Sequence, residues 1–205
     1  MSLITLTEAT THYGLSRDAL KKITAAGLLP ASRRHGRTRL IPQDVAERLS
    51  TRPTAPLHEV LPKDEDTMPV LRVDVAQPVK DQDRPYIGFH ADLAPEHLLE
   101  ALRGWWVGDP KNISRAGLLP ITLGGFVVAV LTGLDDWESR RIFGTRIRHR
   151  FDARLAGYLT DLDEPTNMIE TGPPEDQARA ELLLGTRLPS NAGGPIAYVR
   201  PDPTI

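Results

Sequence analysis

Four arginines and a histidine occur within seven consecutive residues in the first quarter of this sequence. They are Arg33, Arg34, His35, Arg37 and Arg39. An arginine side chain stays charged across the physiological pH range and can donate two parallel hydrogen bonds to one phosphate group. The cluster therefore indicates contact with a polyanion, with the alternative that it is a solvated turn at the tip of a hairpin.

The charge of the chain is divided unevenly. The formal net charge is −2, but residues 1–52 hold nine Lys and Arg against four Asp and Glu, whereas the remaining residues hold sixteen against twenty-three. A basic region on an acidic remainder favours a polyanion that meets this region rather than the whole surface.

Patterns of catalytic and metal-binding residues are sparse. Because the chain has no cysteine, it has no thiolate nucleophile, disulfide or Cys-ligated zinc. The six histidines lack metal-ligand spacing, and the glycine pairs at 124–125 and 193–194 lack the flanking lysine of a phosphate-binding loop. Asp135 and Asp136 fall in a predicted turn. We therefore expect no enzyme activity, no cofactor and no metal site.

Local capping signals predict the elements that position the arginine cluster. Thr7 is the expected N-cap of a helix over residues 8–13, although Thr5 and Glu8 also have the spacing of a capping box. Gly14 is expected to end this helix.

A second helix is predicted over residues 17–26, with Ser16 as its N-cap and Gly27 beyond its end. Arg17 and Lys21 share a polar face of this helix. After the arginine cluster, an apolar strand resumes at residues 40–41 and a third helix begins with a proline. The order helix, turn, helix, hairpin, helix predicts a winged helix-turn-helix over residues 1–50.

The stretch LITLTEATTHYGLSRDALKKITAAGLLPASRRHGRTRLIPQDVAERL, residues 3–49, resembles the excisionase and MerR-type family of winged helix-turn-helix domains. The matching features are GLSRDAL as turn and second helix, AAGLLPA as helix exit, and GRTRLIPQDV as wing strand and third helix. The resemblance implies double-stranded DNA as the partner, with the second helix in the major groove and the wing on the backbone or minor groove. It implies helix contacts from Ser16, Arg17, Lys21 and Lys22 and wing contacts from the arginine cluster.

A single winged module offers limited surface, since specific DNA interfaces usually bury about 1,000 Å² or more of protein. We therefore expect a homodimer or a cooperative oligomer on DNA. MerR relatives dimerise through a long coiled coil after the wing, but prolines at 53, 56, 62 and 69 exclude such a helix here. A small-molecule effector stays unknown, and Lys22 has the alternative of pairing with Asp18 at i, i+4.

Residues 51–69 are proline-rich and acidic, which predicts a linker, and residues 70–205 are expected to form an α+β domain with a mainly antiparallel, curved sheet or partly closed barrel. A short alternating run at 70–75 is expected to begin this domain or to form an edge strand. Further expectations are a helix around Leu98 that is capped near Asp92, a strand pair around residues 124–125, and a helix over 174–184.

The larger domain is also similar to PUA and ASCH-like barrels, some of which bind RNA or modified DNA bases. This similarity implies an alternative function, the reading of modified or flipped bases, with the head as a localising module. The residues implied are Trp105, Trp106, Trp137 and Tyr198 for stacking or partner contact, and Arg146, Arg148 and Arg150 for phosphates. The competing interpretation is that the tryptophans are core anchors and that the arginines pair with acidic side chains.

The sequence has no apolar run of about 20 residues and no secretion-signal pattern. Arg, Ala, Gly, Pro and Leu are plentiful, which is typical of a high-GC bacterial genome. We therefore expect a cytoplasmic, nucleoid-associated bacterial protein with no membrane partner.

Overall fold

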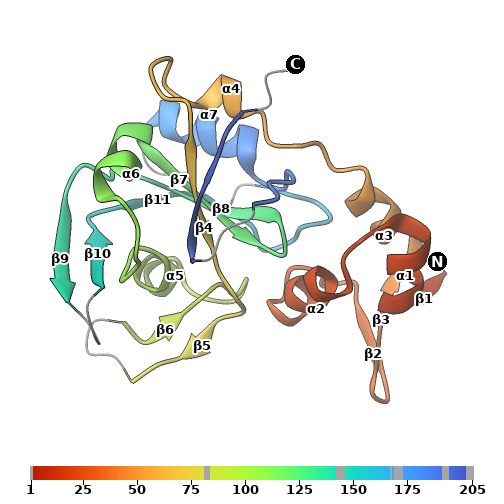
Figure 1. Cartoon of the computed structure of the whole chain (residues 1–205). Helices are drawn as coiled ribbons and strands as arrows, with labels where there is room; N and C mark the ends of the chain where they lie inside the picture. The colour runs from red at the N-terminus through yellow and green to blue at the C-terminus, as the bar shows by residue number, and fades with distance from the viewer. Residues whose placement is uncertain are drawn as a thin grey trace.

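The computed structural model describes residues 2–80, 84–141, 146–166, 168, 173–190 and 194–201. These residues form a small unit, residues 2–50, which we call the head, and a larger unit, residues 68–201, which we call the body (Figure 1). Both contain helices and mainly antiparallel strands, so the predicted α+β class is confirmed. Within the described residues, no helix is long and apolar enough to cross a membrane.

The head consists of three helices and a three-stranded antiparallel sheet with the strand order β1-β3-β2. Its elements are β1 (Leu3–Thr5), α1 (Leu6–Tyr13), α2 (Arg17–Ala25), β2 (Arg33–His35), β3 (Thr38–Pro42) and α3 (Gln43–Ser50). The β2–β3 hairpin, which carries the arginine cluster, projects away from the three helices (Figure 1).

Capping explains where the first two helices begin. The N-cap of α1 is Thr5 and not Thr7, because the Thr5 hydroxyl accepts from Glu8 N at 3.1 Å while the Glu8 carboxylate accepts from Thr5 N at 2.7 Å. This reciprocal box starts α1 two residues earlier than predicted. Helix α2 begins as predicted, since the Ser16 hydroxyl accepts from Ala19 N.

The body is built on a five-stranded sheet with the order β11-β8-β7-β4-β12, in which only β4 and β7 run parallel. Two short antiparallel pairs, β5–β6 and β9–β10, lie outside this sheet. The elements after the head are α4 (Leu57–Val60), β4 (Met68–Arg72), β5 (Gln77–Pro78), β6 (Tyr86–Ile87), α5 (Pro95–Leu102), α6 (Pro110–Ala116), β7 (Leu118–Leu123), β8 (Phe126–Thr132), β9 (Trp137–Arg141), β10 (Ile147–Phe151), β11 (Arg154–Tyr158), α7 (Pro174–Leu183) and β12 (Ile196–Val199).

Strand β4 has a more central place than the sequence indicates. It is the first strand of the body and lies between β7 and β12, with residues 68–71 buried, so of the two expected alternatives the start of the domain is confirmed and the edge strand is wrong. A proline in this strand would disfavour a central position. Pro69 lies outside the β4–β7 pairing, which involves Leu71 and Arg72, and it is paired only with Tyr198 of β12.

The segment predicted as a linker is packed against the body. Ala55 N donates to Arg187 O at 2.9 Å, and Arg187 N donates to Pro53 O at 2.8 Å. Leu57 and Val60 of α4 are buried. These contacts leave little of the segment free to act as a tether.

The β7–β8 hairpin is the centre of the body sheet, and both of its strands are entirely buried. Its turn is Gly124-Gly125, with φ values of +62° and +87°. Two consecutive positive φ angles suit the right-handed twist of a two-residue hairpin, and glycine adopts them without steric strain. This pair of strands and its turn confirm the sequence prediction.

Helix α5 begins differently from the prediction. The residue at its N-cap position is Ala94, followed by Pro95, and no side chain caps the helix, so the expectation of a capping residue near Asp92 is wrong. Proline in the first turn supplies the helical φ angle without needing an acceptor for an amide. Helix α6, which the sequence analysis missed, has Asp109 as its N-cap.

Helix α2 packs directly against the turn of the body hairpin. A methyl group built on Gly124 would lie 2.9 Å from Ala19 Cα, so this contact requires glycine. Two backbone hydrogen bonds join the units nearby, from Ala91 N to Ala26 O and from Leu162 N to Leu28 O, each 2.8 Å long. The buried apolar side chains of head and body accordingly form one continuous cluster.

An ion pair and two hydrogen bonds to backbone carbonyl oxygens hold the end of α3 against the body. Arg48 donates from Nε and Nη2 to the two carboxylate oxygens of Asp163, at 2.7 and 2.8 Å, which raises the pKa of Arg48 above its ordinary value. Arg52 donates to the carbonyl oxygens of Leu162 and Asp163. The head is therefore attached to the body at α2 and at α3.

The two glycines of the β7–β8 turn provide a test of this packing. Replacement of Gly125 by Ala costs about 1–2 kcal/mol, because alanine is strained at a positive φ angle. The added methyl group itself meets no neighbouring atom. Replacement of Gly124 by Ala causes a similar backbone strain, and in addition the methyl group clashes with α2. We expect Gly124→Ala to lower the melting temperature more than Gly125→Ala, as measured by calorimetry. Equal losses in the two variants would contradict the close packing of α2 on the turn.

Candidate nucleic-acid interface

A cleft of about 400 Å³ lies between α2 and the β2–β3 hairpin of the head. Basic residues from both elements line it: Arg17, Lys21, Arg37 and Arg39. Thr5 and Thr7, at the start of α1, close one side of the cleft. The structure thus brings together two of the predicted helix residues and two of the predicted hairpin residues.

The position of the hairpin relative to α2 is fixed by one of these arginines. Arg39 Nη1 donates to Thr24 O at 3.0 Å, close to the carboxyl end of α2. A cation at this end of a helix also interacts favourably with the helix dipole. Arg39 therefore links the hairpin to α2, the two elements that form the walls of the cleft.

The other members of the arginine cluster lie on the outer strand of the hairpin. Arg33, Arg34 and His35 are exposed on β2, which pairs with β3 and forms the edge of the head sheet. Arg34 Nε donates to Gly36 O at 3.1 Å in the turn. These three side chains extend the basic surface beyond the cleft and do not line it.

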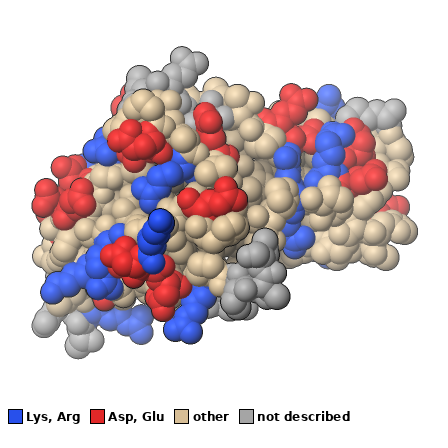
Figure 2. Space-filling view, turned by 90° about the horizontal axis from the view of Figure 1, so that it is seen from above, with Lys and Arg blue, Asp and Glu red and all other residues tan. Residues whose placement is uncertain are grey.

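The basic side chains of the cleft and hairpin are not neutralised by acidic neighbours. Among the residues that the structure describes, no ion pair involves Arg17, Lys21, Arg33, Arg34, Arg37 or Arg39. Elsewhere the surface is mixed: in the view from above, acidic and basic side chains are interspersed over head and body (Figure 2). A concentration of unpaired cations on one feature is what a polyanion site requires.

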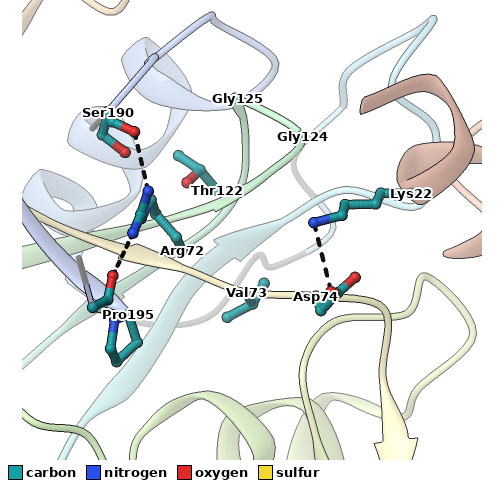
Figure 3. Close-up of a pocket in the computed structure, with 10 residues that line it drawn as sticks. Lys22, Arg72, Val73, Asp74, Thr122, Gly124, Gly125, Ser190 and Pro195 are labelled. Atoms are coloured by element: carbon teal, nitrogen blue, oxygen red, sulfur yellow. Dashed lines mark hydrogen bonds and ion pairs between the residues drawn. The ribbon is translucent and has the colours of Figure 1, made fainter. Parts of the chain in front are cut away.

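Lys22 lies on a different face of α2 from Lys21. Its ammonium is 3.4 Å from the Asp18 carboxylate and 3.5 Å from the Asp74 carboxylate of the body (Figure 3). The i, i+4 pair with Asp18, the alternative that the sequence left open, is thus present. The structure separates Lys22 from the cleft, while Ser16 remains exposed at the N-cap of α2.

The second predicted cluster, on the body, is largely internal. Trp105 is 3% exposed and Trp106 is 7% exposed, and Trp106 Nε1 donates to Leu102 O at 2.6 Å. Arg140 covers Trp105, with its guanidinium carbon 3.7 Å from the ring centroid. In this conformation neither ring offers a face to a base, so the core-anchor interpretation fits better. Trp137, partly buried, packs against the ring of Phe151.

Two of the three arginines of this cluster are engaged in internal contacts. Arg150 forms an ion pair with Glu100 at 2.9 Å, and Arg148 donates to Trp105 O at 3.3 Å. Arg146, before β10, is exposed. Tyr198 lies on β12 and is 40% exposed, its hydroxyl accepts from Asp109 N at 2.9 Å, and partial burial raises its pKa. The pairing of Arg150 matches the acidic-partner interpretation.

Sequence reasoning missed that the head docks on the body through α2. The signal for it was faint: Ala19 and Lys22 are spaced i, i+3 and therefore share a face, but alanine is common on any helix. A metal site is not indicated by the described part of the chain, where no group of three or more His, Asp or Glu residues is placed to hold an ion.

Comparisons with known proteins give one partial similarity. No model of a protein family matches the chain, and no solved structure matches it. A tRNA dimethylallyltransferase from Corynebacterium glutamicum is 34% identical over 99 residues, which cover 43% of this chain and 33% of that enzyme. The chain therefore spans about a third of the length of the curated relative that it matches.

A partly buried histidine of β10, between Arg148 and Arg150, predicts a pH dependence of the stability. His149 is hydrogen-bonded through Nδ1 to the Ser139 hydroxyl at 2.9 Å, and burial lowers its pKa from the ordinary value of 6.5. The unfolded chain then binds a proton more readily than the folded chain. Above pH 6.5, His149 is neutral in both states and does not affect stability. As the pH falls from 6.5 to the folded-state pKa, the unfolded chain is protonated first, so His149 lowers the stability.

We expect the free energy of unfolding, measured in urea at a series of pH values, to decrease over that interval in the wild type. The variant His149→Gln, which stays neutral, is expected to show a smaller decrease. An identical pH profile in both proteins would show that the burial of His149 does not disfavour its charged form.

Proposed function

We propose that the protein binds double-stranded DNA through its head and acts as a bacterial transcriptional regulator or excisionase-like factor. In this proposal the head is a winged helix-turn-helix of the excisionase and MerR type, α2 enters the major groove, and the β2–β3 hairpin is the wing. The observation that carries the proposal is the cleft between α2 and the hairpin. Four cationic side chains from two elements line it, and none has an acidic partner among the described residues.

The division of labour between the cations follows from their positions. Arg17 and Lys21 occupy successive turns of the exposed face of α2, where side chains can reach base edges in a major groove. Arg37 and the exposed arginines of β2 suit contact with phosphates, which sets affinity and orientation rather than sequence preference. Arg39 is expected to act chiefly through its bond to Thr24 O.

A single head provides too little surface for tight specific binding, so the proposal includes a homodimer or a cooperative oligomer on DNA. The rival proposal, a reader of modified or flipped bases in the body, has weaker support because Trp105 and Trp106 are buried. The name of the partial relative refers to tRNA. Structured RNA is therefore a suitable competitor in the experiment that tests DNA binding.

The test is fluorescence anisotropy with duplexes selected from bacterial genomic DNA, at several salt concentrations. We expect Lys21→Gln and Arg37→Gln to weaken binding, and the loss of the phosphate contact of Arg37 to make the slope of log K against log salt less negative by about 0.9. Arg17→Gln is expected to weaken binding to the selected sequence by about fivefold to a hundredfold, with less effect on random duplex.

The matched control is Lys111→Gln, which removes an exposed cation of α6 on the body and is expected to leave DNA affinity unchanged. Wild-type affinity and salt slope in both Lys21→Gln and Arg37→Gln would refute the proposed interface. Tighter binding to a tRNA transcript than to any selected duplex would refute DNA as the principal partner.

A further inference from the structure

A cavity of about 400 Å³ lies in the body between α5, the edge strand β11 and the beginning of α7. Leu99 of α5 and Leu155 of β11 line it, and both are only partly buried although they pack against the core. The volume lies in the range of sites for small organic molecules, about 300–1,000 Å³. The apolar side chains of the wall are Pro95, Leu99, Ala153, Leu155, Ala156 and Pro173.

A buried carboxylate forms part of the polar wall. Asp176 is 9% exposed, and its Oδ2 accepts from the Thr132 hydroxyl at 2.7 Å and from Arg154 Nη2 at 3.0 Å. Within the part of the chain that the structure describes, its other oxygen, Oδ1, has no hydrogen bond. Arg154 and Asp176 thus form an ion pair in which their charges balance, while one carboxylate oxygen is still able to accept.

A second carboxylate, Glu96, gives the cavity an excess of negative charge. It lies in the first turn of α5, three residues before Leu99, so the two side chains share a face of the helix. Among the described residues, the Glu96 carboxylate has neither an ion pair nor a hydrogen bond. The wall therefore carries two carboxylates, Glu96 and Asp176, against the single guanidinium of Arg154.

We propose that this cavity binds a small organic amine, whose apolar part contacts Leu99 and Leu155 and whose ammonium group lies at Glu96 and Asp176. The apolar wall favours a hydrophobic molecule, because binding removes the exposed parts of both leucines from water. The unbalanced charge of Glu96 favours a cation over a neutral molecule or an anion.

The ammonium group also has an acceptor in the free oxygen of Asp176, and a hydrogen bond between charged groups is stronger than one between neutral groups. No residue of this cavity belongs to the head cleft, so the site does not depend on the proposed function.

The experiment uses the full chain and four probes: 2-phenylethylamine, 2-phenylethanol, 3-phenylpropanoate and methylamine. At neutral pH we expect calorimetric titration to give saturable binding of 2-phenylethylamine, at least about tenfold tighter than that of 2-phenylethanol. We expect no binding of 3-phenylpropanoate, because Glu96 repels its charge, and none of methylamine, which has no apolar part.

The variant Glu96→Gln removes the unbalanced charge and keeps the length of the side chain. It is expected to weaken 2-phenylethylamine by about twofold to fivefold, the effect of a partly exposed ion pair, and to leave 2-phenylethanol unchanged. The matched control is Glu175→Gln, which removes an exposed carboxylate of α7 that does not line the cavity. This control should bind 2-phenylethylamine as the wild type does.

Melting temperatures establish that the variants are folded and add a second readout. The amine 2-phenylethylamine should raise the melting temperature of the wild type and of Glu175→Gln, and should raise that of Glu96→Gln less. Equal affinity for 2-phenylethylamine and 2-phenylethanol overturns the proposal, as does equal affinity of the wild type and Glu96→Gln for the amine. Binding of methylamine as tight as that of 2-phenylethylamine overturns it too, because the apolar wall would then contribute nothing.

Discussion

Helix α2 approaches the β7–β8 turn so closely that Gly124 has no room for a side chain opposite Ala19. This contact makes one nine-residue helix a part of two units at once, because α2 forms a wall of the head cleft and also packs on the body through Ala19. The diglycine turn is what permits the approach, since it reverses the chain without presenting a Cβ atom to the helix. Any change in the position of the turn would therefore move α2.

The consequence is a division of the charged residues of α2 between its faces. Among the residues that the structure describes, Arg17 and Lys21 have no acidic partner beside the hairpin, whereas Lys22 forms ion pairs with Asp18 and Asp74. Adjacent lysines thus have opposite electrostatic environments.

Sequence reasoning succeeded where structure is decided by a few neighbouring residues. The Ser16 cap, the helix end at Gly14 and the diglycine turn all depend on local hydrogen bonds or local φ angles. It failed where the outcome depends on contacts that are distant in sequence. The central place of β4 follows from pairing with β7 and β12, and the docking of Ala19 on Gly124 joins residues with no shared pattern. Tryptophan was ambiguous for a similar reason, since its large ring suits a core as well as a binding surface.

The contacts of Pro53 and Ala55 with Arg187 leave Thr51 and Arg52 as the residues between α3 and the point where the chain joins the body. So short a span does not allow the head to move independently of the body, as it could on a long flexible linker. If the head binds DNA as proposed, the DNA must accommodate the bulk of the body beside it. If two copies bind side by side, the width of the body will set the minimum spacing between their sites.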